Sequence, residues 1–198
     1  MKILAVADVE DRLLYDHFKK ERVEGVELIV SCGDLRADYL DFLMTMVNVP
    51  MIYVRGNHDD RLVSKPPLGA VCIENKVYKY NGVRFLGLGG SVGNKPGALN
   101  LYTEDQMNRR IMKMTPSIML NGGFDILVTH SPAKGYGDMK GSFSHQGYEC
   151  FNKLINRYSP EYMLHGHVHD SYGNVKLYHD HESGTKIVNC CGFKIIEI

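Results

Sequence analysis

The chain has 198 residues and a formal net charge of zero, because 23 Lys and Arg residues balance 23 Asp and Glu residues. Its length suits one domain, expected here over residues 1–198, and its 44% hydrophobic and 23% charged residues are typical of a globular protein. Zero net charge disfavours non-specific binding to nucleic acid, although it does not exclude a local basic patch. No stretch approaches the roughly 18 apolar residues of a membrane span, so no membrane partner is expected.

The cysteines and the N-terminus favour a cytoplasmic protein. There are five cysteines, an odd number without paired metal-site spacing, which is typical of reduced thiols. The apolar run 2–7 is too short for a signal peptide, and charged residues follow it at once.

Short apolar runs alternate with longer amphipathic stretches along the first third of the chain, which is an α/β pattern. The runs at 2–7, 28–31 and 51–54 predict strands. Between them, residues 12–21 and 37–47 predict helices.

The middle of the chain contains a hairpin signal. Residues 77–80 and 83–88 flank Asn81-Gly82, and this dipeptide supplies the positive φ angles of a tight turn. Further along, we expect helices at 103–114, with Thr103 as its cap, and 146–157, and strands at 125–129, 162–164, 175–178, 186–189 and 193–198. This order predicts two mixed sheets packed face to face with helices outside.

Polar residues follow five of the predicted buried strands. They are Asp8-Val9-Glu10, Gly33-Asp34, Gly56-Asn57-His58-Asp59, His130, and His165-Gly166-His167-Val168-His169. Because the carboxyl ends of strands line the ligand crevice of an α/β sheet, these groups should meet at one edge.

Each of these motifs also has an ordinary structural explanation. Asp8 could cap a helix, Gly33-Asp34 could form a turn, and His130 could be a hydrogen-bonded, semi-buried residue. The three histidines at 165, 167 and 169 are harder to explain in this way, because neighbouring imidazoles repel when charged and bind metal when neutral. Taken together, the motifs predict a metal site.

The series Asp8-x-Glu10, Gly33-Asp34, Gly56-Asn57-His58-Asp59, His130 and Gly166-His167-x-His169 resembles the calcineurin-like metallophosphoesterase superfamily. It does so in the family's order, and residues 129–172 are similar to its small phosphodiesterase branch. The resemblance implies a four-layer α-β-β-α sandwich and two divalent ions. One ion would be held by Asp8, residue 10, Asp34 and His169. The other would be held by Asp34, Asn57, His130 and His167, with Asp34 bridging.

The resemblance also implies roles in catalysis. His58 would contact the phosphate or protonate the leaving alkoxide, and Asp59 would orient it. General chemistry agrees. Two ions about 3.5–4 Å apart can bind a bridging hydroxide and the phosphate, and a neighbouring imidazole can protonate the leaving group. Asn57 would add a neutral oxygen ligand beside the substrate.

Glu10 departs from the family pattern, which usually has histidine at this position. If the strand stays extended, residues 8 and 10 share a face, so Glu10 can point at the metal. Its carboxylate adds a negative charge, which favours a harder ion such as Mn²⁺, with Fe, Zn, Ni or Co as alternatives. Arg36, two residues past Asp34, is the best candidate among the nearby arginines for contacting phosphate, although a surface ion pair is the more ordinary explanation.

The leading hypothesis is therefore a metal-dependent phosphoesterase, a hydrolase acting on a small phosphodiester or phosphomonoester. The main alternative is a degenerate scaffold of the same fold that binds a protein partner with little catalysis. A nuclease shares the chemistry but needs a basic groove, which the neutral composition does not promise. The sequence leaves the substrate and the oligomeric state open.

Overall fold

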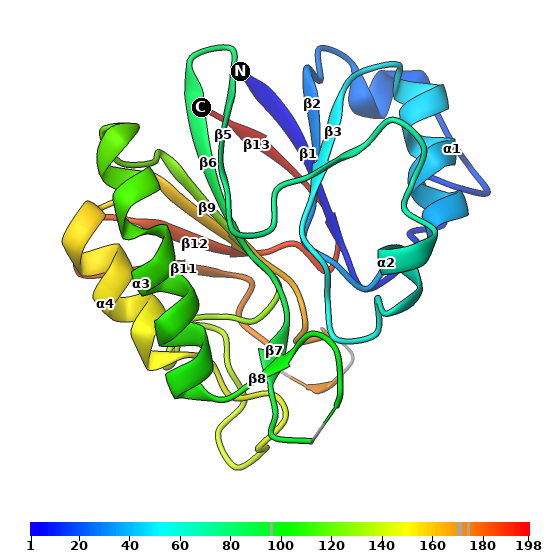
Figure 1. The fold of residues 1–198 in the computed structure, drawn as a ribbon. Coiled ribbons are helices and arrows are strands. Elements are labelled where there is room, and N and C mark those ends of the chain that lie inside the picture. The colour runs from blue at the N-terminus through cyan, green and yellow to red at the C-terminus, as the bar shows by residue number, and fades with distance from the viewer. Residues whose placement is uncertain (96, 170–171, 174) are drawn as a thin grey trace.

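The computed structural model describes residues 1–95, 97–169, 172–173 and 175–198. Two mixed sheets stack between helices, as Figure 1 shows, with α1 (Ala37–Val47) on one outer face and α3 (Glu104–Leu120) and α4 (Glu149–Tyr158) on the other. This is the predicted four-layer α-β-β-α arrangement of the α/β class.

The first sheet has five strands in the order β13-β1-β2-β3-β4. They are β1 (Lys2–Ala7), β2 (Leu28–Ser31), β3 (Met51–Tyr53), β4 (Val71–Cys72) and β13 (Gly192–Glu197). β1 to β4 run parallel, and only β13 is antiparallel to its neighbour β1.

The second sheet has six strands in the order β11-β12-β10-β9-β6-β5. They are β5 (Val77–Tyr80), β6 (Val83–Leu88), β9 (Ile126–Thr129), β10 (Tyr162–His165), β11 (Tyr178–Asp180) and β12 (Lys186–Asn189). The predicted hairpin is confirmed, with Asn81 and Gly82 both at positive φ in its turn. A small third pair, β7 (Ser91–Val92) and β8 (Leu101–Tyr102), leads into α3.

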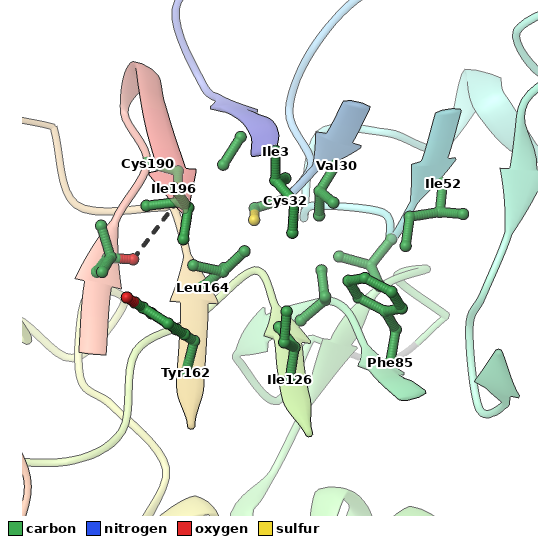
Figure 2. Close-up of a cluster of buried hydrophobic side chains, with 14 of the residues drawn as sticks. Ile3, Val30, Cys32, Ile52, Phe85, Ile126, Tyr162, Leu164, Cys190 and Ile196 are labelled. Atoms are coloured by element: carbon green, nitrogen blue, oxygen red, sulfur yellow. Dashed lines mark hydrogen bonds between the residues drawn. The ribbon is translucent and has the colours of Figure 1, made fainter. Parts of the chain in front are cut away.

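Three apolar clusters hold the layers together. The central one lies between the sheets, where Figure 2 shows residues such as Ile3 and Val30 facing Leu164 and Phe85. The second packs α3 and α4 on the six-stranded sheet, and the third packs α1 on the five-stranded sheet. Burying both faces of each sheet explains why the strands are nearly continuous apolar runs.

The prediction of a helix at residues 12–21 is wrong. Residues 12–17 form turns, followed by a short 3-10 helix, η1 (Lys20–Val23). The Asp11 carboxylate accepts a hydrogen bond from the Leu13 N–H at 2.8 Å, and Arg22 donates to the carbonyl of His17 at 2.7 Å. The bond from Arg22 uses a carbonyl that the predicted helix would pair with the Glu21 N–H.

Other element boundaries moved. Thr103 caps α3 as predicted, in a reciprocal arrangement with Gln106, but the helix continues through Pro116 to Leu120. The helix predicted from 146 begins at Glu149, where the Glu104 carboxylate accepts the first backbone N–H groups. The strand predicted at 175–178 lies instead at Tyr178–Asp180, and α2 (Arg61–Ser64) was not predicted.

Among the described residues, no helix combines the length and the apolar composition that crossing a bilayer requires.

Candidate metal centre

The carboxyl ends of the parallel strands from both sheets meet at one end of the sandwich. Asp8, Asp34 and Asn57 follow β1, β2 and β3, whereas His130 and His167 follow β9 and β10. Hydrogen bonds join the two groups directly, because the His167 N–H donates to both carboxylate oxygens of Asp8, at 3.0 and 2.9 Å. The fold therefore brings together residues more than 150 positions apart, as the sequence predicts.

Four of the expected ligands surround one point. His130 Nε2 lies 3.3 Å from Asp34 Oδ2, 3.0 Å from Asn57 Oδ1 and 3.1 Å from His167 Nδ1. Ligand-type atoms of Asp34, His130 and His167 all fall within 4.8 Å of one another, which no other trio of His, Cys, Asp or Glu achieves in the part of the chain described. Two imidazole nitrogens with carboxylate and amide oxygens suit a divalent transition metal.

Backbone carbonyls select the imidazole tautomers. His130 Nδ1 lies 2.8 Å from the carbonyl of Cys32, and His167 Nε2 lies 2.7 Å from the carbonyl of Ser144. A carbonyl oxygen can only accept, so each of these nitrogens carries the proton. The lone pair of His167 Nδ1 then faces the centre, and so does that of His130 Nε2 once this ring loses its second proton, as metal-binding histidines require.

The loop that supplies the Ser144 carbonyl is held at both ends by Asp138. One oxygen of this carboxylate accepts the Gly135 N–H at 2.9 Å and the other accepts the Gly147 N–H at 3.1 Å. Within the loop, the Met139 N–H donates to the carbonyl of His145 at 3.0 Å. Asp138 thus supports the centre through Ser144.

Asp8 and His169 lie beside this group at a looser spacing. His169 Nε2 is 4.0 Å from Asp8 Oδ1, and the Asp8 side chain is fully buried whereas that of His169 is 32% exposed. Gly166 is required here, because a Cβ atom at that position would lie 2.5 Å from Asp8 Oδ2.

Three of the candidate ligands have left-handed backbone conformations. The φ angles are 62° at Asp8, 58° at Asp34 and 71° at His167. Such conformations cost on the order of 1–2 kcal/mol in non-glycine residues and cluster at functional sites. They turn these side chains towards the centre immediately after the strands end.

Neighbouring carboxylates and burial determine the protonation of the histidines in the centre. Burial lowers the pKa of His130, but the neighbouring carboxylates of Asp34 and Asp8 outweigh it and raise this pKa to about 9. Burial raises the pKa of Asp34, yet His130 and the His58 N–H outweigh that effect and lower it. Burial and the charge on His130 together lower the pKa of His167 to about 3. The imidazolium of His130 is therefore the positive partner of the Asp34 carboxylate.

Asp59 connects two loops of the centre, and its role in orienting His58 stays a prediction. Its Oδ2 accepts the Asp34 N–H at 2.7 Å and the Gly56 N–H at 2.8 Å, so it ties together the loops after β2 and β3. Burial raises the pKa of Asp59 to about 6. The His58 side chain is exposed and lines the adjoining cavity, while its N–H donates to Asp34 Oδ1 at 2.8 Å.

Glu10 lies next to Arg36 in this structure. The extended backbone assumed for it ends at Ala7, because Asp8 is left-handed and the Val9 N–H turns back to the Ala7 carbonyl at 2.6 Å. That premise of the sequence argument is therefore wrong. Glu10 Oε1 instead pairs with Arg36 Nε at 3.1 Å, and the same guanidinium binds Asp38 with distances of 3.1 and 2.7 Å. Metal binding by Glu10 and phosphate binding by Arg36 stay predictions.

A cavity of about 520 Å³ opens over the ligands. Its lining includes residues that the sequence does not mark as functional, namely Lys95, Phe143 and Tyr172. Tyr172 stacks on His169 with ring centroids 5.0 Å apart. A larger hollow of about 630 Å³ lies at the opposite strand ends, where Arg84 and Asp125 already pair with each other.

The segment His179-Asp180-His181 lies at the edge of the second sheet. Its first two residues belong to β11, and His181 is buried. The His181 N–H donates to the Thr185 carbonyl at 2.9 Å, which closes the turn between β11 and β12.

Comparisons with known proteins identify the family of the chain. The family model described as calcineurin-like phosphoesterase matches residues 1–171. A UPF0046 protein of Caenorhabditis elegans is 35% identical over 74 residues, which cover 37% of this chain and only 17% of that protein. An uncharacterized protein of Methanocaldococcus jannaschii is 23% identical over 185 residues, covering 86% of this chain and 81% of that protein.

Solved structures share the fold. The crystal structure of TT1561 of Thermus thermophilus superposes with a TM-score of 0.66 at 18% identity, covering 96% of this chain and 89% of that one. Another crystal structure reaches a TM-score of 0.72 at 14% identity, covering 98% and 94%. With the family model spanning most of the sequence and every residue of the site motifs, the chain belongs to the calcineurin-like phosphoesterase family.

Proposed function

We propose that this chain is a dinuclear-metal-dependent phosphoesterase that hydrolyses small phosphodiesters or phosphomonoesters. The observation that carries the proposal is the convergence of donor atoms from Asp34, Asn57, His130 and His167. Backbone carbonyls set the tautomers of the two histidines in this group. Asp8 and His169 support a second ion beside the first, sharing Asp34, with Glu10 as its further ligand. Mn²⁺ is the proposed ion, with Fe, Zn, Ni or Co as alternatives, because oxygen and imidazole donors are mixed.

Two bound divalent ions supply a nucleophile from water at neutral pH and neutralise charge on the phosphoryl oxygens. The chain's own residues do the rest. His58 is exposed at the cavity, where its imidazole can hold the phosphate or give a proton to the leaving alkoxide. Asn57 can contact substrate as well as an ion, since it lines the same cavity.

The cavity supports a small substrate. It is open, and it combines the metal ligands with polar groups such as Asn94 and Lys95 and with the exposed rings of Phe143 and Tyr172. The balanced net charge supports small phosphate esters over polymeric nucleic acid. An odd number of cysteines supports a cytoplasmic location.

The test is hydrolysis of bis-p-nitrophenyl phosphate and p-nitrophenyl phosphate by metal-free protein reconstituted with Mn²⁺, Ni²⁺, Co²⁺ or Fe²⁺. Wild-type protein should turn over at least one substrate. Asp34→Ala should lose activity and both ions, because one carboxylate serves both. Asp105→Ala, an exposed carboxylate at the start of α3, is the matched control and should retain both.

No hydrolysis with any of the four ions would favour the alternative, a scaffold of this fold that binds a protein partner. Retention of two full-occupancy ions in Asp34→Ala would contradict the shared ligand.

A further inference from the structure

The two halves of the centre are prepared to different degrees. At the first position, Asp34, His130 and His167 lie within 4.8 Å of one another, and bonds to Cys32, Ser144 and the His58 N–H fix their orientations. This half, completed by Asn57, is called the primary position below.

The other half, which we call the secondary position, consists of Asp8, His169 and Glu10. Both oxygens of Asp8 already accept the His167 N–H, and His169 Nε2 stands 4.0 Å from Asp8. Glu10 is engaged elsewhere, with its Oε1 on Arg36 Nε at 3.1 Å.

We propose that Arg36 and the second metal ion compete for Glu10, so that the chain binds one ion tightly and the other weakly. This inference rests on the proposed function and concerns the loading of the same centre. The primary position fills first. The secondary position fills only when Glu10 leaves Arg36, and Arg36 is therefore a positioning residue that sets the affinity for the second ion.

The exchange is feasible because Arg36 has a second partner. Its guanidinium binds both oxygens of Asp38, at 3.1 and 2.7 Å, so it stays paired when Glu10 departs. The ion pair lies near the surface, with side-chain exposures of 64% for Arg36 and 27% for Glu10, so its contribution is modest and a divalent ion can displace it. Histidine at position 10 would be free of this competition when neutral, because a neutral imidazole forms no ion pair with a guanidinium.

The experiment is a calorimetric titration of metal-free protein with Mn²⁺ at pH 8, with free Mn²⁺ counted in parallel by electron paramagnetic resonance. Wild-type protein should show one tight and one weak class of site. Arg36→Gln should tighten the weak class by roughly two- to fivefold, the effect that an exposed ion pair allows, and leave the tight class unchanged. Glu10→Gln should weaken the weak class, because it removes the carboxylate that the second ion would bind.

Two controls separate competition from simple charge removal. Arg12→Gln removes the same charge two residues from Glu10, where Arg12 pairs with Asp16 at 3.3 Å and not with Glu10. It should change the weak class less than Arg36→Gln does. In a double-mutant cycle, Arg36→Gln should have no effect in the Glu10→Gln background, because nothing remains to compete for.

Two sites of equal affinity in wild-type protein would overturn the inference, as would a tightening by Arg36→Gln that persists without Glu10. These outcomes leave the proposed function intact if the protein hydrolyses phosphate esters. Conversely, if Asp34→Ala bound as much Mn²⁺ as wild-type protein, or if neither protein bound Mn²⁺, the proposed function itself would be refuted.

Discussion

The imidazole of His130 spans the two sheets, with Nδ1 on the carbonyl of Cys32 at 2.8 Å and Nε2 on the carboxylate of Asp34 at 3.3 Å. Cys32 and Asp34 follow β2, whereas His130 follows β9. In the absence of metal, the ring is the positive partner of Asp34, so its charge should be visible in the pH dependence of stability.

Metal-free protein should lose stability as the pH rises from about 6.5 to 9. The pKa of His130 is raised in the folded state to about 9, whereas an unfolded histidine titrates near about 6.5. The stabilisation from the raised pKa is thus fully present below about pH 6.5 and is lost as the pH rises through 9. Melting temperatures measured with chelator should fall over this window. The fall should be flatter in His130→Gln, and an equal fall in both proteins would refute the assignment.

His58→Ala should slow turnover without removing metal. The backbone N–H of residue 58 still donates to Asp34 Oδ1 in this variant, so the ligands keep their support. Loss of a general acid costs about 10²- to 10⁴-fold in rate, and the loss should be largest for esters with poor leaving groups. Rates across a series of aryl and alkyl phosphodiesters, with metal content measured alongside, check this. His17→Ala, an exposed histidine outside the centre, is the control. A uniform loss across all leaving groups would assign His58 to phosphate binding.

Asp59→Ala should weaken metal binding as well as stability. Its carboxylate is buried and accepts the N–H groups of Asp34 and Gly56, and each donor left unsatisfied costs about 1–3 kcal/mol. We expect a lower denaturation midpoint in urea and a larger dissociation constant for Mn²⁺. Asp60→Ala offers a comparison one residue away at an exposed position. Normal metal affinity in Asp59→Ala would show that the two loops hold their positions without it.

Gly56→Ala should abolish metal binding, because a Cβ atom at this position would lie 2.1 Å from Asp34 Oδ1 and 2.7 Å from His130 Cε1. The added methyl group would clash with two ligands at once, so at least one of these ligands would have to move. Gly69→Ala introduces the same methyl group where nothing lies within 4 Å, and it should bind metal normally despite the strain of φ +83°. Calorimetric titration with Mn²⁺ compares the two, and equal affinities would mean that the ligands can adapt.

The sequence was sufficient for the ligand positions because glycines and polar side chains follow apolar strands, as at Gly33-Asp34 and His130. It was insufficient where backbone groups orient the side chains. The carbonyls of Cys32 and Ser144 fix the two imidazoles, yet a carbonyl gives no residue-type signal. The left-handed φ of Asp8 also breaks the alternation from which the orientation of Glu10 was inferred, and strand periodicity cannot anticipate that turn.

The same limit applies to the segment after Asp8. Its apolar spacing resembles that of a helix, but the His17 N–H donates to the Arg12 carbonyl and Arg22 donates to the His17 carbonyl, so the pairing of a regular helix is not kept. These contacts depend on the folded path of the chain and not on local propensity.

The ligands come from both layers of the sandwich, since Asp34 and Asn57 follow strands of one sheet and His130 and His167 follow strands of the other. An ion bound among them would link the two sheets and resist any sliding of one sheet over the other. Binding to the native state alone adds stability that grows with ion concentration. Chelation should therefore accelerate amide hydrogen exchange on both sides of the sheet interface together, at the end of the sandwich that holds the centre.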